Sequence, residues 1–266
     1  MITILSANPP LGEVSLKADK KFDWNLPVTE KVADVLRAFG ITVQRLKNNA
    51  ITHQCDIKLS SGQIAYITGP SGSGKSVLLR EFYNTFAGGE KINIDDIPLP
   101  DDKTCVDCID PTPIAQCQNQ ETTDSTNGNR NDFGLGTKQD NRCGVLETLR
   151  NLSCAGLTDV FCVLNSPANL SEGQKYRYRI AKAITSDKQF IFADEFCSNL
   201  DRVTAAIISY NLRKFATKTG KIFVLASSHD DLLVDLLPDV IVIKHLAGEA
   251  EVIYKNPSGV SHPIAE

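Results

Sequence analysis

The sequence has no long run of hydrophobic residues and no strong excess of one charge. Its longest apolar segments, at residues 221–228 and 239–246, are far shorter than the about 20 residues needed to span a bilayer. The chain has 28 Lys and Arg residues and 32 Asp and Glu residues. It therefore has no overall positive charge that would favour binding to nucleic acid or to an anionic membrane. The start of the chain also lacks the features of a secretory signal. We therefore expect a chain without a membrane span and a cytoplasmic location.

The chain has eight cysteines, but its length of 266 residues and its 42% hydrophobic content are enough for a core without disulfides. We therefore expect reduced thiols. Four of them bracket a polar segment, residues 117–142, which is predicted to be a flexible loop. Four thiolates could close a tetrahedral Zn²⁺ site, and the alternative is a set of free thiols near solvent. These cysteines are Cys105, Cys108, Cys117 and Cys143.

The order of apolar segments predicts an N-terminal extension over residues 1–45 and an α/β domain over residues 46–266. The extension contains one amphipathic helix, residues 29–41, that Gly40 could end. In the domain, short β-branched and aromatic runs alternate with helical stretches, as in buried parallel strands with crossover helices. The predicted strands lie in residues 63–69, 188–196, 221–228 and 239–246, and the predicted helices in residues 76–89 and 202–220.

A glycine-rich stretch, GPSGSGKS at residues 69–76, follows the first of these strands and precedes a helix. It matches the pattern G-x-x-x-x-G-K-[ST], in which backbone N–H groups surround phosphate oxygens. Lys75 would reach the β- and γ-phosphates, and the Ser76 hydroxyl would coordinate Mg²⁺. The predicted nucleotide-binding residues are Gly69, Pro70, Ser71, Gly72, Ser73, Gly74, Lys75, Ser76 and Val77.

Two further segments carry polar groups where a nucleotide site needs them. The apolar run FIFA ends at Asp194 and Glu195, which predicts Asp194 as a ligand of Mg²⁺ and Glu195 as the general base. Residues 170–184 read as a helix start in which Ser171 and Gln174 form a capping box and Gly173 leaves the helix N-terminus open to an anion. A helix start of this kind can receive a phosphate, and the alternative is an ordinary capped helix.

These segments together resemble those of the ATP-binding cassette (ABC) ATPases, over about residues 50–250. GPSGSGKS resembles the Walker A motif, LSEGQ the signature motif and FIFADE the Walker B motif. SNLD at residues 198–201 resembles the D-loop, and His229 stands where the family has its switch histidine. The resemblance implies a P-loop NTPase core of ABC type, with a mostly parallel sheet flanked by helices, a small β subdomain and a reduced helical subdomain.

The resemblance also implies the roles of several residues. Ser76 and Asp194 would bind Mg²⁺, Glu195 would polarise water, and His229 would contact the γ-phosphate of ATP. Gln116 would serve as the glutamine of the Q-loop and as a further metal ligand, with Gln118 and Gln120 beside it as the alternatives. Ser171, Gly173 and Gln174 would complete the ATP site of a second copy of the chain, so that ATP joins two copies and hydrolysis releases them.

Three departures from the family's pattern leave the function open. Residues 40–60 contain no aromatic side chain for stacking on adenine, which leaves His53 or Arg45 as candidates. The Q-loop leads into the polar segment, and the X-loop of exporters is missing. We therefore expect an ATPase that pairs head to tail and acts on a soluble protein or nucleic acid. The alternatives are the ATP-binding subunit of a transporter with its membrane domains on a separate chain, and an ATP-binding switch without turnover.

Overall fold

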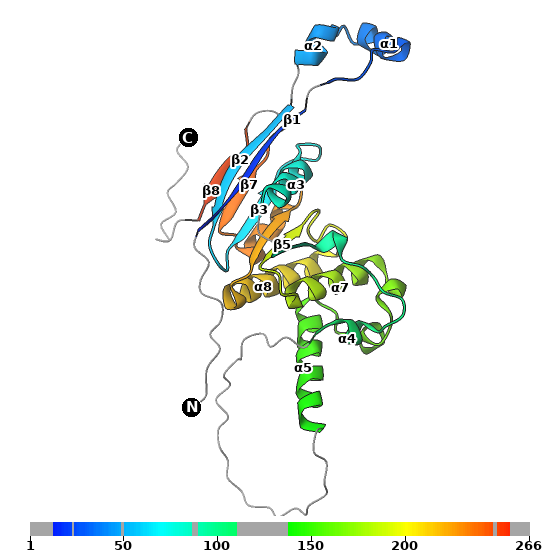
Figure 1. Ribbon diagram of the computed structural model, residues 1–266, viewed down its shortest axis with the longest axis vertical. Helices are drawn as coiled ribbons and strands as arrows, with labels where there is room; N and C mark the ends of the chain where they lie inside the picture. Colours follow the sequence, from blue (N-terminus) through cyan, green and yellow to red (C-terminus); the bar gives the residue numbers. More distant parts are fainter. Residues whose placement is uncertain are drawn as a thin grey trace, which may run out of the picture.

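The computed structural model describes residues 13–22, 24–48, 51–86, 90–110, 138–246 and 249–255, and contains two sheets in this part of the chain (Figure 1). The larger sheet has the order β4-β5-β6-β3-β7-β8, and the smaller one pairs β1 with β2. The strands of the larger sheet are β3 (Ile64–Thr68), β4 (Lys91–Asn93), β5 (Phe190–Ala193), β6 (Ile222–Ala226), β7 (Val240–Ile243) and β8 (Glu251–Tyr254).

Strands β4, β5, β6, β3 and β7 run parallel to their neighbours, and β8 pairs antiparallel with β7. The register pairs Asn93 with Phe192, Ala193 with Leu225 and Ile67 with Ala226. The carboxyl ends of these strands therefore meet at one edge of the sheet, which is where open α/β sheets bind their ligands. The mostly parallel sheet predicted from the sequence is confirmed.

Two hydrophobic cores cover the two faces of the larger sheet. Ala65 and Ile67 of β3 face α3 (Lys75–Thr85) and the smaller sheet, whereas Ile64 and Tyr66 face the helices on the other side. Because every central strand is buried on both faces, the strands read as continuous apolar runs in the sequence. The remaining helices are α4 (Cys105–Cys108), α5 (Lys138–Cys154), α6 (Val160–Val163), α7 (Glu172–Thr185), α8 (Arg202–Thr219) and α9 (Leu233–Leu236).

A bidentate ion pair fixes α8 to the sheet. Arg213 on α8 contacts Asp239 at the start of β7, with 2.5 Å between Nη1 and Oδ2. The same Asp239 oxygen accepts a hydrogen bond of 2.9 Å from the backbone N–H of Ile64. These half-buried contacts join a helix to two neighbouring strands, β3 and β7, at the edge opposite the carboxyl ends.

The smaller sheet consists of β1 (Val14–Phe22) and β2 (Ile51–Leu59), which pair antiparallel over nine residues. Between them, α1 (Glu30–Ala38) and α2 (Val43–Asn48) stand apart from the rest of the molecule (Figure 1). The α1 helix begins at the cap of Thr29, and Gly40 follows its end with a φ angle of 63°. The domain boundary expected at residue 46 stays a prediction, but β1 lies in the expected extension and completes a sheet with β2.

The polar segment 117–142 lies almost entirely outside the described residues. Its last five residues, 138–142, belong to α5, where a loop was expected. In the described ranges, none of the helices combines the length and apolar character needed to cross a bilayer.

Candidate functional site

The phosphate-binding loop (P-loop, residues 69–76) connects β3 to α3, as the sequence predicts. Gly69, Gly72 and Gly74 have positive φ angles of 140°, 79° and 94°. A Cβ atom at Gly69 would lie 2.1 Å from the backbone oxygen of Lys244, and one at Gly74 would lie 2.1 Å from Cε1 of His53. Two of the three glycines are therefore required both by the backbone conformation and by close packing.

The P-loop carries side-chain hydrogen-bond donors close to its own backbone. Lys75 is almost buried, and its Nζ donates to the carbonyl oxygens of Gly69 and Pro70 at 2.8 Å and 3.0 Å. The buried hydroxyl of Ser73 has no hydrogen-bond partner among the described residues. Ser76 and Val77 lie half-buried in the first turn of α3, whereas Pro70, Ser71 and Gly72 are exposed. The loop thus keeps donors at a helix N-terminus, which fits a phosphate group.

His53 of β2 lies beneath the P-loop. Its side chain is only 5% exposed, and its ring fills the space beside Gly74. Burial lowers the pKa of this imidazole, and the charge of Lys244 acts in the same direction. His53 is therefore a packing residue of the loop, and its buried ring is not open to a nucleotide base.

The predicted carboxylates follow β5 directly. Asp194 is half-buried, and its Oδ1 accepts a hydrogen bond of 3.0 Å from the backbone N–H of Glu195. Glu195 is exposed and has a φ angle of 48°, which is rare for a residue with a side chain. Directly after it, the N–H of Phe196 donates to the carbonyl oxygen of Ala226 at 2.8 Å. The turn that carries the two carboxylates is thus fixed to the neighbouring strand β6.

His229 follows β6 at the same edge of the sheet. Its side chain is exposed, and its backbone oxygen accepts a hydrogen bond of 2.6 Å from the hydroxyl of Tyr66 on β3. The next residue, Asp230, is hydrogen-bonded to Thr68 at the end of β3. The segment after β6 is therefore tied to the strand that leads into the P-loop.

The start of α7 has the capping box expected from the sequence. The Ser171 hydroxyl accepts a bond of 3.4 Å from the N–H of Gln174, and Oε1 of Gln174 accepts one of 3.0 Å from the N–H of Ser171. The Gln174 amide also donates to Sγ of Cys162 on α6 at 2.9 Å. Gly173 lies close to Leu200 and Asn199 of the segment SNLD. Within one chain α7 and the P-loop belong to different sides of the sheet, so the structure does not bring them together (Figure 1).

Gln116 and Cys117 lie outside the described residues, and Cys143 lies in a part of α5 whose side chains are not described. Cys105 and Cys108 begin and end the short helix α4. Burial raises the pKa of the Cys105 thiol to about 11, so this group is protonated at neutral pH. Among the residues that the structure describes, no group of three or more His, Cys, Asp or Glu side chains is arranged to hold a metal ion. The zinc site stays a prediction.

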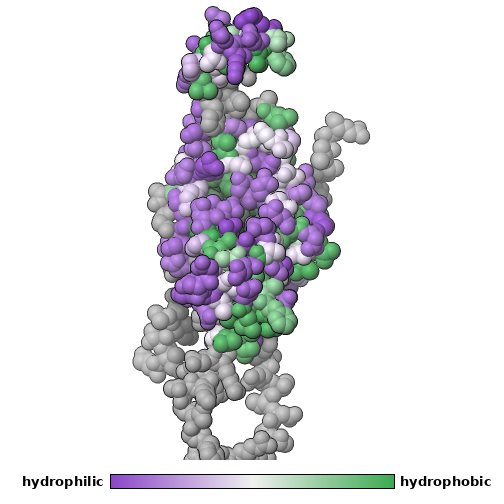
Figure 2. Space-filling view, turned by 90° about the vertical axis from the view of Figure 1, so that its right-hand side faces the viewer, coloured by the Kyte–Doolittle hydropathy of each residue, from purple (hydrophilic) through white to green (hydrophobic). Residues whose placement is uncertain are grey.

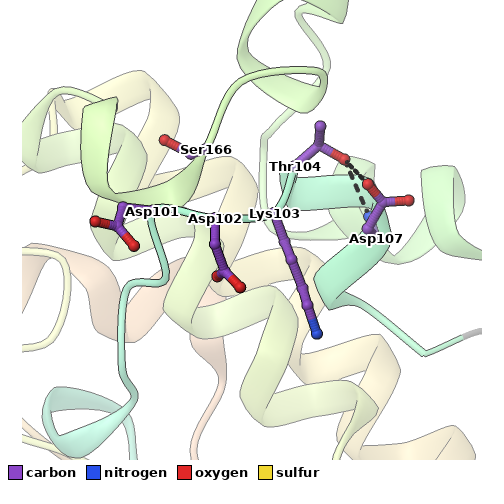
Figure 3. Close-up of a pocket in the computed structure, with 6 residues that line it drawn as sticks. All are labelled: Asp101, Asp102, Lys103, Thr104, Asp107 and Ser166. Atoms are coloured by element: carbon purple, nitrogen blue, oxygen red, sulfur yellow. Dashed lines mark hydrogen bonds between the residues drawn. The ribbon is translucent and has the colours of Figure 1, made fainter.

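An acidic pocket of about 490 Å³ lies beside α4, between the loop before this helix and Ser166 (Figure 3). Its Thr104 hydroxyl caps α4 and donates to Asp107 at 2.6 Å. Figure 3 shows that the carboxylates of Asp101, Asp102 and Asp107 do not converge on one point. The pocket therefore lacks the arrangement of a cation site.

Asp95 is a candidate that the sequence reasoning missed. It lies in η1 (Ile94–Asp96), directly after β4, which runs parallel to β5. Burial raises the pKa of the Asp95 carboxyl, whereas a hydrogen bond with the backbone of Asp194 lowers it. The signal in the sequence was weaker than for Asp194, because the short strand before Asp95 contains Lys91 and Asn93 and is only half-buried.

Trp24, the single tryptophan of the chain, was not considered in the sequence search for an aromatic residue that could stack on adenine. Lys20 of β1 pairs with His53, whose ring contacts Gly74, and Trp24 follows four residues after Lys20. The half-buried Trp24 therefore lies at the same end of the smaller sheet as the P-loop. A search confined to residues 40–60 could not find it, because only the pairing of β1 with β2 places it there.

The fold and the P-loop define a nucleotide-binding protein of the P-loop class, and comparisons with known proteins narrow this further. The family model described as ABC transporter matches residues 52–198. The chain is 30% identical over 256 residues to the methionine import ATP-binding protein MetN of Streptococcus pneumoniae serotype 4, covering 84% of this chain and 67% of that protein. The chain belongs to the ABC transporter family.

Other similar proteins agree with this assignment. The sn-glycerol-3-phosphate import ATP-binding protein UgpC of a Ruegeria species is 27% identical over 213 residues, which are 79% of this chain and 57% of that protein. The chain thus spans between about three fifths and two thirds of these two relatives. A solved ATP-binding cassette dimer with ADP and phosphate has a TM-score of 0.55 at 17% identity, covering 91% of this chain and 98% of that one. The ABC ATPase fold predicted from the sequence is confirmed.

Proposed function

We propose that the chain is the ATP-binding and ATP-hydrolysing subunit of an ABC transporter whose membrane domains lie on a separate chain. The observation that carries the ATPase proposal is the convergence of the P-loop, Asp194, Glu195 and His229 on one edge of a parallel sheet. The relatives described above are named as import ATP-binding proteins. This supports the transporter alternative better than the action on a soluble protein or nucleic acid that the sequence suggested first.

The residues at the sheet edge have the chemistry that the reaction requires. The P-loop N–H groups and Lys75 would bind the phosphates of ATP. The oxygens of Ser76 and Asp194 are hard ligands that fit Mg²⁺, which when bound would neutralise charge on the phosphates. Glu195 is exposed and would accept a proton from the attacking water, and His229 would contact the γ-phosphate. Gln116 stays a predicted ligand outside the described residues.

A second copy of the chain would complete each nucleotide site. The N-terminus of α7 carries Ser171, Gly173 and Gln174, but it lies away from the P-loop of its own chain. Its capping box holds the helix start in a defined conformation, with the backbone of the first turn ready to meet an anion. In a head-to-tail pair, this end of α7 would meet the ATP bound by the partner's P-loop.

An apolar groove offers a place for the membrane partner. A cavity of about 880 Å³ is formed by residues of α4, α5 and α6, with Val145, Leu149 and Leu164 in its walls. Beside it, Phe161 is 86% exposed. Figure 2 shows hydrophobic residues gathered at the lower end of the molecule, the end where α5 lies in Figure 1. Exposed apolar patches mark interaction sites, so we propose that a segment of the membrane partner binds here, at the cytoplasmic face.

Phosphate release by the purified chain tests the enzymatic part. We expect Mg-dependent ATP hydrolysis, a loss of ATP binding in Lys75→Ala, and at least a roughly 100-fold slower turnover in Glu195→Gln, since this change removes the general base. Light scattering of Glu195→Gln with Mg-ATP should show a dimer. A wild-type chain that binds ATP without turnover would instead support the switch without hydrolysis.

Recovery with membranes tests the coupling. In cells that produce the protein, we expect the chain to be recovered with an integral membrane protein, and Phe161→Asp to abolish this recovery. Leu246→Asp is the matched control, because Leu246 is 69% exposed but lies after β7, outside the groove. Wild-type protein that never associates with membranes, yet changes its turnover with a soluble protein or nucleic acid, would favour the other function.

A further inference from the structure

A second carboxylate lies beside Asp194 at the edge of the sheet. Strands β4 and β5 are parallel, and their register pairs Asn93 with Phe192. Asp95, in η1, and Asp194 each lie two residues beyond this pair, just after the ends of neighbouring strands. The pairing of strands thus brings together two carboxylates that are 99 positions apart in the sequence.

Asp95 and Asp194 interact where their two strands end. A hydrogen bond with the backbone of Asp194 lowers the pKa of the Asp95 carboxyl, whereas the charge of the Asp194 carboxylate raises it. The adjacent Asp96 has a different partner, since its Oδ2 accepts a bond of 3.3 Å from the Asn93 amide. Arg179 of α7 is the nearby positive charge, but its Nε donates to the carbonyl oxygen of Ile97 at 3.2 Å.

Asp95 is also available to a ligand. Its side chain is exposed, and among the described residues no Lys, Arg or His nitrogen forms an ion pair with it. Two neighbouring carboxylates repel each other, and a divalent cation bound by oxygen ligands offsets this repulsion. The ligand itself is indicated independently by the P-loop, whose buried Ser73 hydroxyl lacks a partner among the described residues.

We propose that Asp95 and Asp194 act as a carboxylate pair that binds the Mg²⁺ of Mg-ATP, a role for which the sequence suggested Gln116. This inference rests on the proposed ATPase function and adds to it a residue from β4. Asp95 has a simpler possible role as a cap for the backbone of Asp194. The two roles differ in their need for charge, because a cap needs only an oxygen acceptor whereas the cation needs a carboxylate.

The variant Asp95→Asn separates the two roles, since asparagine keeps an oxygen acceptor for the Asp194 N–H and removes the charge. It should be made in the Glu195→Gln chain, so that bound ATP is not consumed. Equilibrium binding of ATP is then measured in EDTA and over a Mg²⁺ titration, and Mn²⁺ bound to the ATP complex is counted by electron paramagnetic resonance. Asp96→Asn is the matched control, and Asp95→Glu restores the charge.

We expect Asp95→Asn to raise the Mg²⁺ concentration needed for tight ATP binding at least about tenfold, in line with the loss of a supporting metal ligand. ATP binding in EDTA should stay unchanged. Asp96→Asn should match the parent chain, and Asp95→Glu should recover most of the Mg²⁺ response. Equal Mg²⁺ and Mn²⁺ responses in the Asp95→Asn and parent chains would overturn the inference and leave the ATPase intact. A parent chain that binds no ATP in either condition would overturn both.

Discussion

The two sides of the larger sheet differ in how completely they are covered. On the side of α3, the smaller sheet and the P-loop pack so closely that a single added methyl group at Gly74 would meet the ring of His53. On the other side, α5 and α6 leave Leu146, Phe161 and Leu164 more than half exposed around a groove. The contrast indicates that the α3 side of the sheet is closely packed by this chain's own residues, whereas the helical side keeps exposed apolar side chains where a partner is proposed to bind.

The close packing at the P-loop predicts the largest effect. Gly74→Ala places a Cβ atom against His53, whereas Gly72→Ala has nothing within 4 Å of the new atom. Both substitutions should lower the free energy of unfolding by about 1 to 2 kcal/mol, because alanine disfavours a positive φ angle. Gly74→Ala should lose about 1 to 3 kcal/mol more, because it also overpacks the core. The free energy of unfolding in urea measures the difference.

A double variant checks the physical reason for this effect. If the clash with the imidazole is the cause, the added cost of Gly74→Ala should shrink in the His53→Ala background. Equal stabilities of Gly72→Ala and Gly74→Ala would show that the loop relaxes easily, and the contrast between the two sides would lose its basis.

The buried His53 predicts a pH dependence of intermediate size. Because burial and Lys244 lower its pKa in the folded chain, the unfolded chain binds more protons below the ordinary value of 6.5. The contribution of His53 to the free energy of unfolding is therefore fully present above pH 6.5 and decreases as the pH falls below that value. Thermal unfolding of the wild type and of His53→Gln between pH 5 and pH 7.5 should show a weaker dependence in the variant. An unchanged dependence would assign the effect to other groups.

The helical side predicts the smallest effect on stability. Phe161→Ser should change the free energy of unfolding by no more than about 0.5 kcal/mol, because its side chain is 86% exposed. The same substitution should weaken association with the proposed membrane partner. A loss of stability beyond about 1 kcal/mol would mean that Phe161 packs within the chain, and the helical side would then be more complete than the structure indicates.

The sequence predicted the elements around the site well, for local reasons. The strands before Gly69, Asp194 and His229 are short apolar runs that no helix pattern matches. The capping box of Ser171 and Gln174 depends on residues three apart, so its sequence pattern already contains the geometry. Predictions of this kind need no knowledge of distant contacts.

Other features could not be predicted, because they depend on pairing between distant segments. From the sequence, the β1 segment was assigned to an N-terminal extension. The pairing of β1 with β2 could not be predicted, because 28 residues separate the two strands. Asp95 is placed beside Asp194 only by the pairing of β4 with β5, and Trp24 is placed at the P-loop end of the smaller sheet only by the pairing of β1 with β2. A single sequence specifies such registers only weakly until opposite faces are packed.

The amino-acid sequence by itself determined the class of this protein, since the P-loop, the carboxylates after an apolar strand and the capped helix each depend on neighbouring residues. The tertiary structure alone decided which of these groups share an edge of the sheet, which side of the sheet is closed, and that Asp95 lies beside Asp194. The physical reason is that strand order and register are set by the burial of both faces of the sheet, a property of the whole chain rather than of any segment.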